Sequence, residues 1–190
     1  MARIGGRKPG PLLRVAYRMT QRQFGGDRVP EPVEINAHHP LLMNGYGALE
    51  LAFQRSRKAP ARLKVLAEMK AAAMVGCPWC LDFGSYLSLE SGVTEEQLRE
   101  LPRFRESDAF DDEEKLVLEY AEGISKTPAE ISDELFERLR ARFDEAQIVE
   151  LTYAAAIENL RSRFNWALGI ESQGYSDGAV CAVPERAPAA

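Results

Sequence analysis

The sequence has few of the side chains that usually bind metal ions or transfer protons, with three cysteines and two histidines among 190 residues. A structural zinc site needs four ligands, which usually come from two close pairs. Cys77 and Cys80 form one close pair, and the residues left to complete a site are Cys181, His38 and His39. We therefore expect no metal and no cofactor, and we assign Cys181 no role.

Long apolar runs and an excess of positive charge are also lacking. No run approaches the roughly 20 apolar residues that span a bilayer. The basic N-terminus differs from a signal peptide, because Arg14, Arg18 and Gln21 interrupt its apolar residues. The net charge is −5, so we expect neither a nucleic-acid nor a membrane partner. We place the protein in the cytoplasm, where thiols are kept reduced.

The alternation of apolar and polar residues that is typical of strands is missing too, and nearly every long segment has helical periodicity. The predicted class is all-α, with an N-terminal arm and connector (1–36), a main helical domain (37–175) and a tail (176–190). Residues 25–40 are predicted to be a connector, because three prolines forbid a continuous helix there. The predicted helices cover 11–24, 40–56, 61–75, 78 to about 90, 94–98, 111–125, 132–143 and 144 to about 168.

The stretch "AAAMVGCPWCLDFGSYL" contains the cysteine pair. Gly76 is typical of a residue just past a helix end, and Pro78 suits the first turn of the next helix. Cys77 would then be the N-cap, more exposed and more acidic, with Cys80 one turn further on the same face. Two thiols so placed could form a disulfide, and the helix N-terminus favours a thiolate. Two buried core cysteines or half of a metal site remain alternatives.

The motif in its helical setting resembles the AhpD-like alkylhydroperoxidases of the carboxymuconolactone decarboxylase family. The resemblance covers about residues 37–175, from "AHHPLLMNGYGALELAF" through "VGCPWCLDFGS" to "NLRSRFNWALGI". It implies an all-α fold, with active sites near the subunit contacts of a trimer or hexamer. It also implies that Cys80 attacks a small organic hydroperoxide, that Cys77 resolves the sulfenic acid into a disulfide, and that an external dithiol restores both thiols.

Two proton-handling residues of the family pattern are absent, because Val65 replaces a glutamate twelve residues before the first cysteine and Gly84 replaces a histidine four after the second. Glu68 lies on nearly the same helix face as Val65, one turn nearer the cysteines, so we expect it to act as the proton relay.

Glu158 is the lone charged residue in the apolar run "LTYAAAIENL". We expect it to pair with Arg161, on the same stripe as Asn165, although a relay role remains open. His38 and His39 are expected to be structural, with contact to the site as the alternative.

Three functions follow from these patterns. The first is a thiol-dependent peroxidase or, failing that, a thiol–disulfide oxidoreductase. The second is a decarboxylase acting on an anionic lactone, for which Arg161 and Arg163 are possible contacts. The third is a non-catalytic oligomeric scaffold or binding module.

Overall fold

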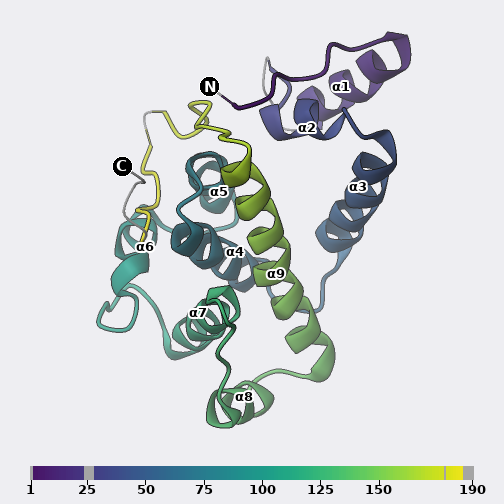
Figure 1. Cartoon of the computed structure of the whole chain (residues 1–190). Coiled ribbons are helices and arrows are strands. Elements are labelled where there is room, and N and C mark those ends of the chain that lie inside the picture. Colours follow the sequence, from purple (N-terminus) through teal and green to yellow (C-terminus); the bar gives the residue numbers. More distant parts are fainter. Residues whose placement is uncertain (1, 24–27, 178, 186–190) are drawn as a thin grey trace.

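The computed structural model describes residues 2–23, 28–177 and 179–185 (Figure 1). These residues form helices and loops without a strand, so the all-α prediction is confirmed. No helix among them is long and apolar enough to cross a membrane. The elements are α1 (Pro11–Gln23), α2 (Glu31–Asn36), α3 (Pro40–Arg55), α4 (Ala61–Val75), α5 (Pro78–Glu90), α6 (Glu95–Glu100), the 3-10 helix η1 (Leu101–Arg103), α7 (Asp112–Ser125), α8 (Asp133–Arg140) and α9 (Glu145–Ala167).

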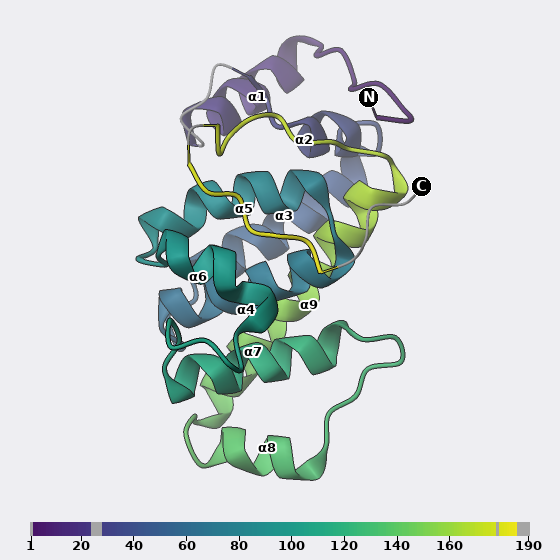
Figure 2. The same cartoon turned by 90° about the vertical axis from the view of Figure 1, so that its left-hand side faces the viewer.

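Helix α4 lies at the centre and packs against α5, α7 and α9 (Figures 1 and 2). Its alanines 71–73 are essentially inaccessible to solvent, and small side chains let neighbouring helices approach closely. Gly76 ends α4 in the left-handed conformation, with φ of 76°, which glycine adopts at little cost. The predicted stop before the cysteine motif is therefore confirmed.

Side-chain caps fix several helix starts. The predicted capping boxes of Thr94 with Gln97 and of Asp111 with Glu114 are both present, and a third, of Asp144 with Gln147, opens α9. In such a box the side chain of each residue accepts a hydrogen bond from the backbone N–H of the other. Fewer N–H groups at the helix start are therefore left without a partner.

The connector prediction for residues 25–40 is wrong in part, because α2 forms inside it. Pro30 is the N-cap of α2 and Pro32 lies in its first turn, where a missing N–H has no helical partner to lose. The predicted extension of the first helix to Phe24 lies outside the described residues.

The N-terminal arm forms a small apolar cluster of its own, in which Tyr17, Val29 and Ala37 are buried. His38 contacts the arm, and His39 caps the helix that follows it. Nε2 of His38 lies 2.9 Å from the carbonyl of Gly5, and Nδ1 of His39 accepts a hydrogen bond from the N–H of Leu42 as the N-cap of α3. These contacts agree with the structural role expected for them.

Candidate functional site

Cys77 and Cys80 stand at the start of α5, as the sequence predicts. Cys77 is the N-cap residue, and its sulfur accepts a hydrogen bond from the backbone N–H of Cys80 at 3.2 Å. Both thiols are free. The expectation that Cys77 is the more exposed thiol is wrong, because both residues belong to the main apolar core, with exposures of 0% for Cys77 and 5% for Cys80.

Polar side chains from α9 surround the sulfur of Cys80. The amide of Asn165 donates a hydrogen bond to this sulfur at 3.3 Å, and the hydroxyl of Ser162 lies close enough to favour the thiolate form of Cys80. Ser162 in turn donates to Oε1 of Glu158 at 2.7 Å. Because Glu158, Ser162 and Asn165 are spaced by four and three residues, they share one face of the helix. All three are buried.

Both Cys80 and Glu158 hold their protons more tightly than they would in water. Burial raises the pKa of the Cys80 thiol well above its usual range, and Cys77 and the negative charge of Glu158 add to this effect. Burial also raises the pKa of Glu158, and its attraction to Arg161 does not offset that rise. The site therefore holds a neutral thiol one hydroxyl away from a carboxyl group that readily carries a proton.

Arg161 binds carboxylates from three helices. Its Nε and Nη2 donate to Glu50 of α3 at 2.8 and 2.6 Å, and its Nη1 donates to Glu68 of α4 at 2.5 Å and to Glu158 at 3.1 Å. The predicted pair of Glu158 and Arg161 is present. Burial opposes ionisation of Glu50, but the bonds from Arg161 outweigh it and lower the pKa of Glu50. One guanidinium thus serves three carboxylates.

The positions without the family's proton-handling residues are occupied by apolar packing. Val65 lies against the main core. At Gly84 an added Cβ would lie 2.6 Å from Sδ of Met69, which is too close for a side chain unless Met69 moves. Met69 itself is buried, so its thioether fills the space that a histidine at position 84 would need.

Asp82, two residues after Cys80, is a structural anchor that sequence reasoning did not assign. Its carboxylate accepts six hydrogen bonds, from four successive backbone N–H groups at 173–176 and from the hydroxyls of Ser172 and Ser176. Burial opposes ionisation, but these bonds outweigh it and lower the pKa of Asp82. The indole of Trp79 also donates to the side chain of Gln173 at 2.8 Å. The loop after α9 is thereby fixed against the cysteine motif.

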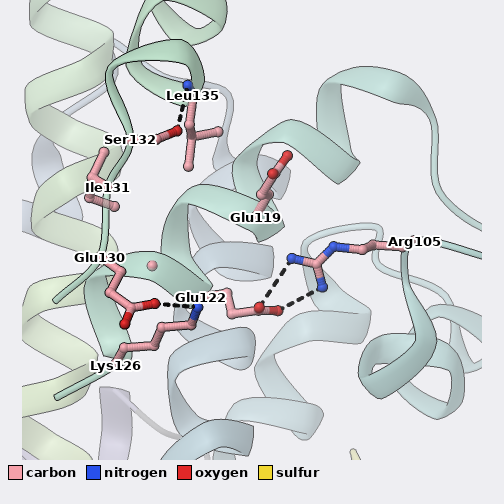
Figure 3. Close-up of a pocket in the computed structure, with 9 residues that line it drawn as sticks. Arg105, Glu119, Glu122, Lys126, Glu130, Ile131, Ser132 and Leu135 are labelled. Atoms are coloured by element: carbon pink, nitrogen blue, oxygen red, sulfur yellow. Dashed lines mark hydrogen bonds and ion pairs between the residues drawn. The ribbon is translucent and has the colours of Figure 1, made fainter. Parts of the chain in front are cut away.

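A surface hollow of about 420 Å³ lies away from the cysteines, beside α7 and α8 (Figure 3). On its wall Arg105 pairs with Glu122 and Lys126 with Glu130, and Glu119 pairs with Arg138 outside the wall. Each charged side chain of this wall therefore already has an ionic partner. Among the described residues, no group of three or more histidine, cysteine or acidic side chains is placed to hold a metal ion.

The sequence profile of the carboxymuconolactone decarboxylase family matches residues 40–123, which include the cysteine motif. The uncharacterized protein YnjA of Escherichia coli strain K12 is 37% identical over 124 residues, 65% of each chain, so the match spans just under two thirds of that relative. The uncharacterized protein YdfG of Bacillus subtilis strain 168 is 32% identical over 105 residues, which cover 55% of this chain and 71% of YdfG.

Solved structures share the fold. The debrominase Bmp8 in complex with 2,3,4-tribromopyrrole superposes with a TM-score of 0.79 at 21% identity, over 90% of this chain and 92% of Bmp8. A protein of unknown function from Agrobacterium tumefaciens, described as a candidate antioxidant defence protein AhpD, has a TM-score of 0.67 at 26% identity, over 73% of this chain and 94% of that one.

Proposed function

The chain belongs to the carboxymuconolactone decarboxylase family, and on that premise we propose that it is a thiol-dependent peroxidase. Cys80 and Cys77 reduce a small organic hydroperoxide and then form a disulfide, which an external dithiol reduces. The supporting observation is the cysteine pair at the N-terminus of α5, with Asn165 bonded to the sulfur of Cys80 and the hydroxyl of Ser162 close to it. A purely structural cysteine in an apolar core would need none of these buried polar neighbours, which are costly to bury.

The reaction balances over three steps. The thiolate of Cys80 attacks the peroxide oxygen, the O–O bond breaks, and the products are a sulfenic acid and an alcohol once the alkoxide gains a proton. The thiol of Cys77 then displaces water from the sulfenic acid and forms the disulfide. A dithiol reductant returns two electrons and two protons by thiol–disulfide exchange. We propose the cytoplasm as the compartment, because a reducing pool of dithiols is available there.

The test uses mass spectrometry on the Cys181→Ser protein, which leaves the pair as the sole thiols. Hydroperoxide treatment should remove two hydrogens within the peptide that holds Cys77 and Cys80. The added change Cys77→Ser should accumulate a sulfenic acid on Cys80 that dimedone traps, and Cys80→Ser should abolish peroxide consumption. The proposal fails if both thiols stay free while a control dithiol is fully oxidised.

A panel of substrates sharpens the assignment. Turnover with alkyl hydroperoxides and a set of dithiol reductants tests the peroxidase, and an anionic lactone tests the decarboxylase for which the family is named. A brominated pyrrole belongs in the panel because a debrominase shares this fold, and removal of bromine would draw the same two electrons from the cysteine pair. Turnover of the lactone or the pyrrole alone would reassign the substrate.

We further propose a homo-oligomer, a trimer or hexamer. Helices α3 and α9 expose large apolar side chains, and contiguous apolar surface of this kind marks interaction sites. Light scattering at micromolar concentration should give a multiple of the 21.2 kDa chain mass, and a mass near 21 kDa would contradict the proposal. The exposed residues are Leu41, Leu42, Leu51, Val149, Tyr153 and Leu160.

A further inference from the structure

The buried face of α9 offers a proton path that does not use the positions of Val65 and Gly84. A serine hydroxyl has one proton to donate and two lone pairs to accept with. Ser162 donates to Glu158 at 2.7 Å, and its hydroxyl lies close enough to the sulfur of Cys80 to lower the pKa of that thiol. A proton can therefore pass between the sulfur and the carboxylate through the serine hydroxyl, in two short transfers.

Arg161 orients this path and does not carry the proton, since a guanidinium stays protonated in proteins. Its Nη1 holds Oε2 of Glu158, which leaves Oε1 for the serine. Glu68 meets the same Nη1 from the other side. The contact with Ser162 therefore favours Glu158 over Glu68 as the proton store.

We propose that Glu158, acting through the hydroxyl of Ser162, takes the proton of the Cys80 thiol and delivers it to the alkoxide that leaves the peroxide. Ser162 is the catalytic residue of this path, because it touches the reacting sulfur, and Glu158 acts through it.

In the first step the thiol proton passes to Ser162 while the proton of Ser162 passes to Glu158. The sulfur then gives an electron pair to the peroxide oxygen as the O–O bond breaks. Glu158 then gives its proton back to Ser162 while Ser162 gives its own proton to the alkoxide. This transfer leaves a neutral alcohol and restores the carboxylate of Glu158. The inference rests on the proposed peroxidase function.

Two rates separate proton delivery from a structural or purely electrostatic role. Alkylation by iodoacetamide requires only the thiolate, whereas peroxide reduction also requires a proton for the leaving group. Removing the charge of Glu158 eases ionisation of Cys80, so Glu158→Gln should keep or raise the alkylation rate. The same change should lower the rate of sulfenic acid formation by about 10²-fold. A structural defect would move both rates the same way.

The reference protein is Cys77→Ser with Cys181→Ser, which isolates Cys80 and keeps a serine as the N-cap. Its rate of sulfenic acid formation should fall at alkaline pH as Cys80 and Glu158 lose the one proton that they share, and Glu158→Gln should lack that fall. Ser162→Ala should lower the rate of sulfenic acid formation as much as Glu158→Gln does. The double variant should lower it no further, because the two groups act in series. Glu150→Gln is the matched control, since Glu150 is a buried carboxylate of the same helix paired with Lys64. It should change neither rate.

The outcomes separate the two proposals. A reference protein that forms no sulfenic acid contradicts the peroxidase function and the proton delivery together. If the reference protein forms sulfenic acid and Glu158→Gln forms it at the same rate, the proton delivery alone is contradicted. If Glu68→Gln, and not Glu158→Gln, slows the peroxide reaction selectively, the proton store is Glu68.

Discussion

Two partly buried charged clusters on opposite faces of α4 differ in their balance of charge. The acid-rich cluster joins one guanidinium to three carboxylates, and the balanced cluster joins two cations to two carboxylates. Glu68 and Lys70, one from each cluster, are two positions apart on α4 and so point in nearly opposite directions. The acid-rich cluster consists of Arg161, Glu50, Glu68 and Glu158, and the balanced cluster of Lys70, Arg105, Glu122 and Glu185.

The balanced cluster is a cross-link. Nζ of Lys70 lies 3.1 Å from Glu122 and 2.7 Å from Glu185, and 4.7 Å from the ring centre of Phe104. Arg105 binds both oxygens of Glu122 at 3.0 Å. Each carboxylate has a cation beside it, so the cluster joins α4, α7 and the tail through ion pairs.

The acid-rich cluster cannot be balanced in that way, because its carboxylates outnumber its cation. A buried excess of negative charge is relieved by binding a proton, and the raised pKa of Glu158, which burial causes, is that relief. Each cluster thus holds one carboxyl with a raised pKa, but Glu158 bonds to Ser162 beside the cysteine motif, whereas Glu185 bonds to Lys70. The comparison teaches that the neighbours of such a carboxyl, more than its burial, separate a chemical role from a structural one here.

The largest expected effect comes from breaking the balanced cluster with Lys70→Met. The change leaves Glu122 and Glu185 without their shared cation. We expect a loss of about 3 kcal/mol at pH 7, the lower end for removing one partner of a buried pair, because these carboxylates retain exposures of 18% and 22%. Urea unfolding measures the loss. The alkylation rate of Cys80 should stay unchanged, and a changed rate would mean that the two clusters are coupled.

Arg161→Met should cost somewhat less, about 2 kcal/mol at pH 7, since Arg161 is 19% exposed against 1% for Lys70. In the wild type, the pKa of Glu50 is lowered, so its contribution is present above the usual value of 4.5 and is lost as the pH falls. Without Arg161 the carboxylates repel, and their pKa values rise. The difference in unfolding free energy between the wild type and Arg161→Met should therefore become smaller as the pH falls through about 4.5. A difference that stays constant with pH would contradict this account.

Glu185→Gln should have the smallest effect, with a loss of about 1 kcal/mol or less. Burial raises the pKa of Glu185 despite its bond to Lys70, so the cost of burying the charge offsets part of what the ion pair contributes. A raised carboxylate pKa stabilises the fold at acidic pH and less as the pH rises. The loss measured by urea unfolding should thus shrink from pH 5 to pH 8. A loss that grows over this range would show that the ionised pair is the stabilising form.

Local signals made most of the fold predictable. Helical periodicity, Gly76 as a stop, and the capping boxes at Thr94 and Asp111 all act within a few residues, so they can be recognised in the sequence. Helix α2 was missed because prolines were interpreted as helix breakers, although Pro30 and Pro32 stand at its start, where proline is tolerated.

The candidate site was predictable only where its contacts are local. The N-cap position of Cys77 and the pairing of Glu158 with Arg161 follow from short spacings. Burial of the two thiols depends on packing of distant helices, and the bond from Glu50 to Arg161 spans 111 positions, so neither leaves a local signal. Ser162 could have been found, because it lies one turn after Glu158 and three residues before Asn165.

The contact between Gly84 and Met69 makes a histidine at position 84 difficult to introduce by a single change. Histidine at 84 with Met69 in place would overpack the core, typically at a cost of about 1–3 kcal/mol. Shortening Met69 first would open a cavity that typically costs about 2–5 kcal/mol. Either single change is therefore costly, and a histidine at position 84 requires that position 69 change with it.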